Sequence, residues 1–285
     1  MLVPVIVVLL FFIAAPIVHS FFLSFHRIII GLPQLKSPFI GLDNYKELIN
    51  DPVARHSFWI TVIFVGTTTF FELLIGLFLA LLIHYRFPGR GALRACVLIP
   101  WAIPTVVSAQ MWRFLFNDVY GVINYAIFGA ATTEYIPWLA LPPTAFLSII
   151  FADIWKTSSF AALLILAGLQ VIPEELYQAA RVDGAGVWRR FLHITWPLIR
   201  PALLVALLFR TIDAFRVFDL AFVMTQGGPA NATNVLQLYG YKKMFVEGWM
   251  GYGSAISVCI FIIVLVLAIL YVRMVGRRLL EASVS

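Results

Sequence analysis

Residues 253–275 read GSAISVCIFIIVLVLAILYVRMV, and this stretch decides what kind of fold the chain can adopt. Its 23 residues carry a single charged side chain, Arg273. A helix of about 20 mostly apolar residues crosses the roughly 30 Å hydrocarbon core of a bilayer. The apolar run is continuous, whereas the strands of a membrane β-barrel alternate apolar and polar residues. The stretch therefore predicts a transmembrane helix.

Five other stretches of the 285-residue chain fit the same description, so we predict an all-α polytopic membrane protein with six transmembrane helices. The first one counts as a span and not as a signal peptide, because its apolar run exceeds the usual h-region of about 7–15 residues and no basic residues precede it. Since Met1 already lies inside this span, we expect that a tail precedes it in the natural protein. No loop is long enough for a separate domain, so residues 1–285 are expected to form one transmembrane domain. The predicted spans are residues 2–25, 58–83, 92–116, 144–169, 201–224 and 253–275.

The composition excludes a soluble protein. Hydrophobic residues make up 62% of the chain and charged residues 12%, and the mean hydropathy is +0.95. Soluble domains carry about 25% charged residues and about 45–50% apolar ones. A soluble enzyme, a disordered regulator and a nucleic-acid binder are therefore poor fits. Cys96 and Cys259 lie in apolar runs without metal-ligand spacing, so we expect both to be buried small hydrophobic side chains.

Basic residues predict the orientation in the membrane. If the N-terminus is cytoplasmic, ten Lys and Arg residues fall on the inner side and six on the outer side. Basic residues collect on the cytoplasmic side of spans, so both termini are expected in the cytoplasm and the protein in the cell membrane. The inner residues are Arg86, Arg90, Arg94, Arg181, Arg189, Arg190, Arg200, Arg273, Arg277 and Arg278, and the outer ones are Arg27, Lys36, Lys46, Arg55, Lys242 and Lys243.

The connection 170–200 is the longest predicted cytoplasmic one, and it has a helical composition. Pro173 suits a first helical turn, and Glu174 and Glu175 suit the positive end of a helix. Residues 183–186, Asp-Gly-Ala-Gly, predict a helix stop, after which a second amphipathic stretch begins. Such a helix–glycine–helix element can dock into the groove of another protein, or it can lie on the lipid surface.

The same connection resembles a family signature. Gln178-Ala179-Ala180, then Gly184, then Ile194-Thr195-Trp196-Pro197 are similar to the EAA motif of the membrane subunits of binding-protein-dependent ATP-binding-cassette importers. Gln178 stands where the motif has glutamate, and Trp196 stands where it has leucine. The resemblance extends over nearly the whole chain and is strongest with the maltose and trehalose importers. It includes residues 39–45 (FIGLDNY), 99–104 (IPWAIP) and 227–229 (GGP).

The resemblance implies that this connection is a coupling helix that seats in an ATP-hydrolysing subunit. The chain itself contains no Gly-Lys dipeptide and therefore no Walker A phosphate loop. The resemblance thus implies a transport subunit that is not itself an enzyme, with no cofactor or metal of its own. Its implied partners are a second homologous permease, an ATPase dimer that binds ATP and Mg, and an extracytoplasmic solute-binding protein, with no nucleic acid. The expected coupling residues are Glu174, Glu175, Gln178, Ala179, Ala180, Asp183, Gly184 and Ala185.

Ionisable side chains within spans are the other signal, because each costs several kcal/mol or more unless it is paired or faces water. The four charges between positions 210 and 219 alternate in sign every three residues, so neighbours can pair along one helix. They can tie helices together, or they can bind the hydroxyl groups of a sugar. For Glu72 a packing role and a pore-lining role both remain open. The charges within or at the edge of spans are Glu72, Arg113, Asp153, Lys156, Arg210, Asp213, Arg216 and Asp219.

Resemblance to the maltose-importer permease implies where the sugar contacts fall, and Phe160, Phe215 and Phe218 can supply an aromatic surface for the sugar. The run 208–216 is more similar to trehalose-type permeases. We therefore expect the permease subunit of an ATP-driven importer that moves a disaccharide such as trehalose or maltose by alternating access. An importer of glycerol phosphate or another small solute, an ion-driven secondary transporter and a membrane-embedded enzyme are the alternatives. The implied substrate-binding residues are Asp153, Lys156, Thr157, Phe160, Arg210, Asp213 and Ala214.

Overall fold

The computed structural model describes residues 3–30, 37–85, 87–129 and 135–284, with only the backbone described for residues 3–4 and 275–284. The described chain is built of helices, and within it the sole β-type pairings are two isolated bridges, His26–Phe39 and Ile29–Trp249. Four of the basic residues that predict the orientation have side chains that the structure does not describe: Lys36, Arg86, Arg277 and Arg278.

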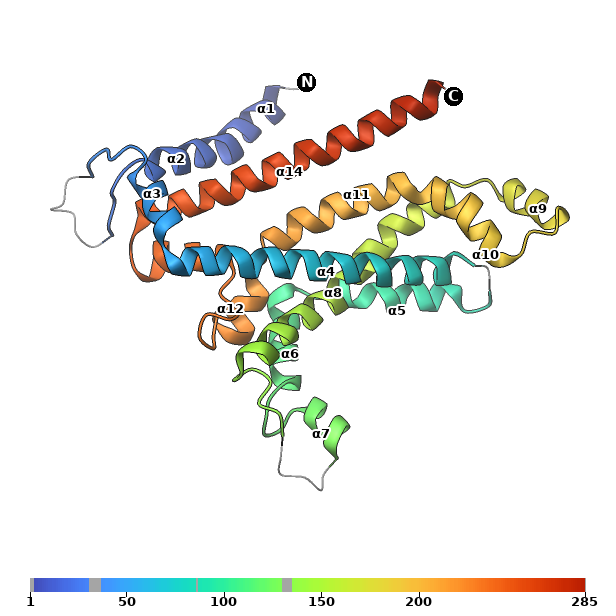
Figure 1. Cartoon of the computed structure of the whole chain (residues 1–285), viewed down its shortest axis with the longest axis horizontal. Helices are drawn as coiled ribbons and strands as arrows, with labels where there is room; N and C mark the ends of the chain where they lie inside the picture. Colours follow the sequence, from blue (N-terminus) through green and yellow to red (C-terminus); the bar gives the residue numbers. More distant parts are fainter. Residues whose placement is uncertain (1–2, 31–36, 86, 130–134, 285) are drawn as a thin grey trace.

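Long apolar helices run broadly along the long axis of the molecule (Figure 1). Five of the described helices are long and apolar enough to cross a membrane, or up to six if one bent pair is counted as a span. The helix α4 has 33 residues, so it is roughly 50 Å long and exceeds the thickness of the hydrocarbon core. The long helices are α1–η1–α2 (Val3–Leu9, Leu10–Ala14, Ala15–Ser24), α4 (Pro52–His84), α8 (Pro142–Gln170), α11 (Trp196–Phe215) and α14 (Met250–Val284).

The third predicted span is broken. Residues 92–116 form a bent pair of helices, because α5 (Arg90–Ala102) and α6 (Thr105–Leu115) meet at an angle of 92°. Pro104 has no N–H to continue the helix, and it holds the preceding Ile103 in an extended conformation with φ −71° and ψ 132°. The 13 residues of α5 are about 20 Å long, so α5 by itself does not cross the bilayer.

The fifth predicted span is also shorter than expected. Helix α11 ends at Phe215, and a separate helix, α12 (Asp219–Thr225), follows it. Arg216 ends α11 with φ −100° and ψ 12°, so the chain leaves the helix there. The predicted series of i,i+3 contacts through residue 219 is therefore wrong beyond its first pair: within the described chain the ion pair forms between Arg210 and Asp213.

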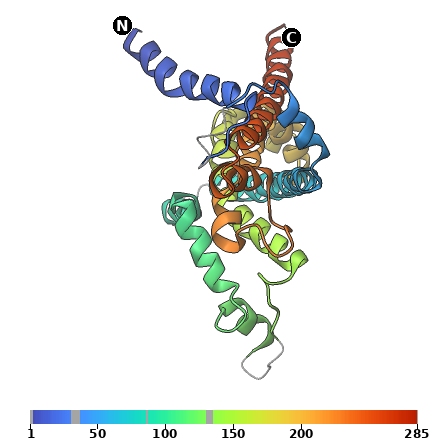
Figure 2. The same cartoon turned by 90° about the vertical axis from the view of Figure 1, so that its left-hand side faces the viewer.

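Short helices cap both ends of the long ones. Figure 2 shows α6 and α7 extending away from the long helices as a separate limb. One group of short elements lies in this limb or at the end of the molecule opposite α9 and α10 (Figure 1): α3 (Asp43–Asn50), α7 (Val122–Phe128), α13 (Leu236–Tyr241) and the π-helical turn η3 (Lys242–Val246). The other group is α9 (Glu174–Val182), α10 (Val187–Arg190) and the π-helical turn η2 (Phe191–Thr195).

Helices α4, α8 and α11 pack closely at the centre of the molecule. Gly76 of α4 lies against Ala161 and Ala162 of α8, and a Cβ atom at Gly76 would come within 2.8 Å of the Ala161 Cβ. Small residues of this kind let helix backbones approach each other in membranes. This close approach brings polar side chains of three spans into contact.

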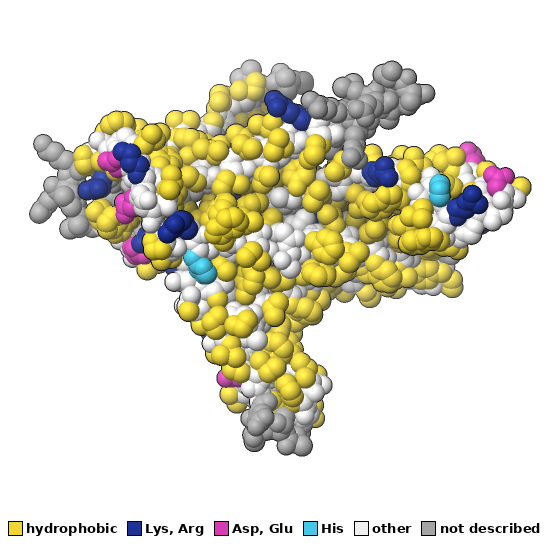
Figure 3. Space-filling model, viewed as in Figure 1, with side chains coloured by type: hydrophobic (Ala, Val, Ile, Leu, Met, Phe, Trp, Pro, Cys, Tyr) yellow, Lys and Arg dark blue, Asp and Glu magenta, His cyan; other side chains and the backbone are white. Residues whose placement is uncertain are grey.

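Hydrophobic side chains cover most of the middle of the face drawn in Figure 3, and charges concentrate towards its two ends. Helix α1–η1–α2 packs on α14 but buries none of its apolar window. The expectation that both cysteines are buried is wrong for Cys96, which is exposed, whereas Cys259 is half-buried. The reason is that α5 has no fully buried residue and so turns Cys96 outward.

Candidate functional site

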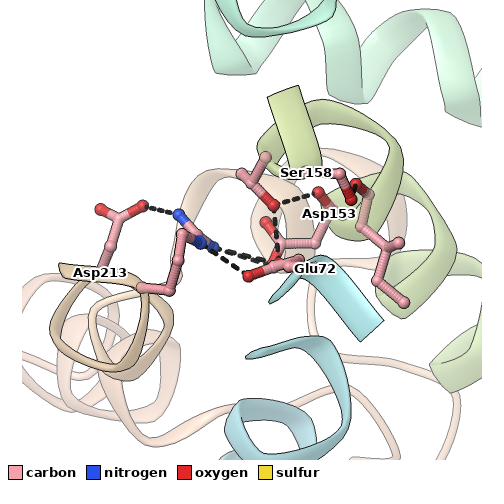
Figure 4. A network of polar contacts seen from close by, with 7 residues as sticks. Glu72, Asp153, Ser158 and Asp213 are labelled. Carbon is pink, nitrogen blue, oxygen red and sulfur yellow. Dashed lines mark hydrogen bonds and ion pairs between the residues drawn. The ribbon is translucent and has the colours of Figure 1, made fainter. Parts of the chain in front are cut away.

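A cluster of charged side chains joins α4, α8 and α11 in the interior of the span layer (Figure 4). The Arg210 guanidinium donates from Nε to Glu72 Oε2 at 2.6 Å and from Nη2 to Glu72 Oε1 at 3.1 Å. It also donates from Nη1 to Asp213 Oδ2 at 2.7 Å, and Nη2 lies 3.7 Å from Asp153 Oδ2. We call Glu72, Asp153, Arg210 and Asp213 the charge cluster. A two-pronged guanidinium–carboxylate contact is the strongest geometry for such a pair, so Arg210 is firmly held on Glu72.

A threonine completes the shell around Glu72. Thr157 Oγ1 lies 2.6 Å from Glu72 Oε1 and 2.6 Å from the backbone oxygen of Asp153. Its single proton serves one of the two acceptors at a time. Asp153 Oδ2 is buried and accepts no hydrogen bond from the described residues, which leaves it the least satisfied atom of the cluster.

The charge cluster contains more acidic than basic groups. Three carboxylates surround one guanidinium, so the formal charge is +1 − 3 = −2 with every group ionised. Glu72 and Arg210 are buried, whereas 70% of the Asp213 side chain is exposed. In Figure 4, Asp213 lies on one side of the network, with Glu72 and Asp153 on the other. Asp213 is therefore the carboxylate that a solute can reach first.

Lys156 of α8 binds the broken end of α5. Its ammonium donates to the backbone oxygen of Ile103 and lies 3.4 Å from that of Trp101 and 3.5 Å from that of Pro100. The last carbonyls of a helix have no partner within the helix, and a cation there also matches the helix dipole. Lys156 thus satisfies carbonyl groups that the break would otherwise leave without donors.

The structure brings the seven implied substrate-binding residues together on α8 and α11. Two of them keep exposed surface: Asp213 is exposed, and Phe160 is half-buried. The site is therefore largely closed in this conformation. The buried members are Asp153, Lys156, Thr157, Arg210 and Ala214.

Other predicted residues lie elsewhere. Phe218 stacks on Phe222 and meets Tyr241 edge-on, so it belongs to a separate aromatic group. Arg113 is exposed on α6, where a pocket of about 470 Å³ opens beside Arg113 and Asn117, away from the charge cluster. Among the described residues, no group of three His, Cys, Asp or Glu side chains is arranged to hold a metal ion.

The predicted helix–glycine–helix element forms at the end of the molecule where α9 and α10 meet (Figure 1). We call residues 174–190 the elbow. Gly184 has φ +75°, and the amide of Ala185 donates to the oxygen of Ala180 at 2.8 Å, which closes the end of α9. Tyr177 and Thr195 hydroxyls lie 3.0 Å apart and tie α9 to the base of α11. The elbow exposes Leu176, Val182, Val187 and Trp188.

Two features of this region were not anticipated from the sequence. The partner of Glu72 is Arg210, 138 positions away, and no local pattern links them. The contact of Lys156 with the α5 carbonyls was also missed, although the two prolines of the run IPWAIP are a signal for a broken helix whose carbonyls need a donor.

Comparison with known proteins places the chain among membrane transport components. The family model described as binding-protein-dependent transport system inner membrane component matches residues 72–281. The chain is 44% identical over 277 residues to the trehalose/maltose transport system permease protein of Thermococcus litoralis, covering 97% of this chain and 92% of that protein. It is 39% identical over 280 residues to the sulfoquinovosyl glycerol transport system permease protein of Agrobacterium fabrum, covering 98% and 90%.

The fold is also that of a solved structure. A chain of a bacterial ABC transporter involved in the import of the acidic polysaccharide alginate superposes with a TM-score of 0.84. The two chains are 24% identical, and the match covers 97% of this chain and 94% of the other.

Proposed function

The chain belongs to the inner membrane components of binding-protein-dependent transport systems, and from this premise we propose that it is the permease subunit of an ATP-driven sugar importer. The cargo that fits best is a neutral disaccharide of the trehalose or maltose type. The observation that carries this proposal is the exposed carboxylate of Asp213, held on Arg210 at the junction of three apolar spans. Charged side chains within spans pair with one another or face a water-filled cavity, and Asp213 is paired and also exposed.

The chemistry of the charge cluster supports a neutral cargo over an anionic one. Sugar hydroxyls donate hydrogen bonds, and the cluster offers carboxylate oxygens to accept them. Its one guanidinium is already engaged by carboxylates, and the ammonium of Lys156 is engaged by backbone oxygens. An anion such as glycerol phosphate would find both of these cations already engaged and would meet the exposed carboxylate of Asp213.

We assign substrate contact to the seven residues grouped on α8 and α11. Asp213 would make the first contact because it is exposed, and the buried members would follow when the helices separate. Replacing Asp213 with Ala should abolish uptake while leaving the complex assembled, since its exposed carboxylate supports little packing. Labelled-sugar uptake and co-purification of the subunits measure the two effects. Normal uptake by the Asp213→Ala protein would make Asp213 a structural charge.

The elbow would dock into an ATPase partner that binds ATP and Mg. Its exposed apolar side chains and small residues would fill a groove, and its eight expected coupling residues lie within it. Closure of two ATPase subunits would push the elbow and move α8 and α11, which flank it. The cavity would then open outward, receive sugar from a solute-binding protein, and return inward after hydrolysis.

A second homologous permease would complete the membrane path. The unburied apolar surface of α1–η1–α2 and the exposed side of α5 offer area for it, with lipid around the remainder. The loop at Gly227–Asn231 would contribute to the outer contact with the binding protein. Both termini would be cytoplasmic.

Transport by the complete complex in vesicles tests the proposal. The permease pair and ATPase are reconstituted with the binding protein and radiolabelled trehalose or maltose, with ATP supplied at the elbow side. Uptake should require hydrolysable ATP and persist when ionophores remove ion gradients. Uptake without ATP that collapses with the ion gradient would instead identify a secondary transporter.

A further inference from the structure

Asp153 is a buried carboxyl group of the charge cluster that has no hydrogen-bond donor of its own. Its side chain is 9% exposed, and its Oδ2 atom accepts no hydrogen bond from the described residues. Arg210 Nη2 lies 3.7 Å from this oxygen, which is beyond hydrogen-bond distance. The same guanidinium donates to Glu72 at 2.6 and 3.1 Å and to Asp213 at 2.7 Å. Arg210 therefore gives its short hydrogen bonds to the other two carboxylates.

The neighbouring donors are engaged elsewhere. Lys156 of α8 donates to the backbone oxygen of Ile103. Thr157 shares its single proton between Glu72 and the Asp153 backbone oxygen, so none is left for the Asp153 carboxyl. Among the described residues of α5, α6 and α12, which also pack on α8, none forms an ion pair with Asp153. The titratable and charged groups that face Asp153 are Glu72 of α4, Lys156 of its own helix, and Arg210 and Asp213 of α11.

An ionised Asp153 would leave the buried part of the charge cluster with excess negative charge. Glu72 and Arg210 cancel each other, whereas Asp213 is exposed and its charge is solvated. A carboxylate without a matching cation or hydrogen bonds is strongly destabilised when buried, and such a group takes up a proton instead. Glu72 also lies within hydrogen-bond reach of the Asp153 side chain (Figure 4), and two adjacent carboxyl groups keep one proton between them.

Glu72 is the member of this pair that stays ionised. It accepts two hydrogen bonds from Arg210 and one from Thr157, and all three favour a carboxylate. A proton on Glu72 would weaken these bonds and leave Asp153 ionised without a donor. A proton on Asp153 removes the excess charge and turns Asp153 into a donor that can bind Glu72. Asp153 is therefore the better place for the proton.

We propose that Asp153 keeps its proton near neutral pH and positions Glu72 by donating a hydrogen bond to it. Asp153 is then a positioning residue: it supports the Glu72–Arg210 pair, which in turn holds Asp213. The buried part of the charge cluster has a formal charge of +1 − 1 = 0 in this state. A neutral lining suits an uncharged sugar, and this consequence for the cargo rests on the proposed function.

Infrared difference spectroscopy detects the proton directly, because a protonated carboxyl group and a carboxylate absorb at different frequencies. The assembled complex is purified near neutral pH in a detergent without ester or sugar groups, since lipid esters absorb close to the carboxylic acid band. The spectrum of the wild type minus that of Asp153→Asn should contain a carboxylic acid band. Asp51→Asn is the matched control and should remove carboxylate bands instead, because Asp51 accepts hydrogen bonds from two amides and two tyrosine hydroxyls.

The pH dependence of stability is a second readout, which simple packing of the side chain would not change. The folded protein holds a proton that the unfolded chain releases above about pH 4, so a rising pH destabilises the wild type. Between about pH 5 and about pH 7, the wild-type unfolding midpoint should fall by a few °C relative to that of Asp153→Asn, which is neutral throughout. Asp51→Asn should keep a constant gap from the wild type over this range. Asp153→Ala lacks the hydrogen bond to Glu72, so its midpoint should lie below that of Asp153→Asn.

Each outcome has one meaning. Carboxylate bands without an acid band in the Asp153→Asn difference spectrum would overturn the inference, and so would a constant gap in midpoint. An acid band that disappears in Glu72→Gln but remains in Asp153→Asn would place the proton on Glu72 and overturn it as well. If Asp153→Asn fails to assemble, isotopic labelling of aspartate carboxyl carbons in the wild type replaces it, and an acid band that does not shift would overturn the inference. A wild-type complex that shows the acid band but takes up no sugar with ATP would support the charge state and overturn the proposed function alone.

Discussion

At the scale of single residues, Glu72 is the side chain on which the charge cluster depends. It is fully buried, and it accepts two hydrogen bonds from Arg210 and one from Thr157. Of the packing role and the pore-lining role that the sequence left open, its full burial fits the packing role. It ties helices together, and through Arg210 it positions the exposed Asp213. A buried guanidinium without this partner would be strongly destabilising.

Replacing Glu72 with Ala should therefore destabilise the complex by about 3–5 kcal/mol, because it leaves the Arg210 charge buried and less well paired. Glu247→Ala is the matched control: its 2.7 Å pair with Lys243 is partly exposed, so we expect a loss of about 1 kcal/mol or less. Thermal unfolding of the purified complexes compares the two. Equal losses of stability in the two variants would show that burial of the Glu72–Arg210 pair adds no stability.

Asp51 is a second residue whose charge the fold uses. It caps α4 by accepting from the amides of Val53 and Ala54, and it also accepts from the hydroxyls of Tyr239 and Tyr252. Burial raises the pKa of Asp51, but these hydrogen bonds outweigh it, so the pKa lies below the ordinary value of 3.8. The ionised form is thus favoured in the folded protein.

This lowered pKa predicts a pH dependence. The stability from Asp51 is fully present above its unfolded pKa near 3.8 and is lost as the pH falls through the lower folded value. Asp51→Asn removes this contribution, so the gap in unfolding midpoint between wild type and variant should be constant near neutral pH. The gap in unfolding midpoint should narrow once the pH falls below 3.8, the ordinary pKa of Asp51. A gap that widens as the pH falls would contradict a lowered pKa of Asp51 in the folded protein.

At the scale of elements, the elbow depends on one backbone conformation. Gly184 has φ +75°, and a Cβ atom there would meet nothing within 4 Å. A side chain at this position is therefore strained by the backbone alone, at a cost of about 1–2 kcal/mol. The sequence predicted both helices and the glycine stop, because capping and turn signals act within a few residues.

Gly186 provides a matched control for the elbow. It too has open space around its Cβ position, but its φ is −65°, which any residue adopts. Gly184→Val should lower sugar-stimulated ATP hydrolysis and recovery of the ATPase with the complex, whereas Gly186→Ala should leave both near wild type. Equal effects would indicate that the elbow tolerates no side chain at either site, independent of backbone strain. Unchanged activity in Gly184→Val would refute the docking role.

At the scale of the whole molecule, the elbow and the α3 region lie at opposite ends of the span layer (Figure 1). The predicted orientation puts the elbow in the cytoplasm. In a background with Cys96 and Cys259 replaced by Ala, Glu175→Cys should react with a membrane-impermeant maleimide only in inside-out vesicles. Glu47→Cys on α3 should react only in right-side-out vesicles. The reverse pattern would invert the orientation.

Features that depend on neighbouring residues could be predicted from the sequence alone. Apolar runs of sufficient length predicted the spans and the class of protein, and the signature around Gly184 pointed to the family that the comparisons establish. The 92° break between α5 and α6 escaped prediction, although Pro104 lies at its centre, because a proline kink in a membrane helix can be mild or sharp depending on its neighbours.

Which charges meet depends on the packing of the helices. Glu72 and Arg210 lie on different spans, and the sequence contains several other partners of suitable sign for each. Their pairing follows from the close packing of α4, α8 and α11, which small residues such as Gly76 permit. Likewise, Lys156 reaches the carbonyls of Trp101 and Ile103 only because α5 breaks beside α8. Local chemistry fixes a helix, whereas contacts between distant helices depend on how their surfaces fit, which no single segment encodes.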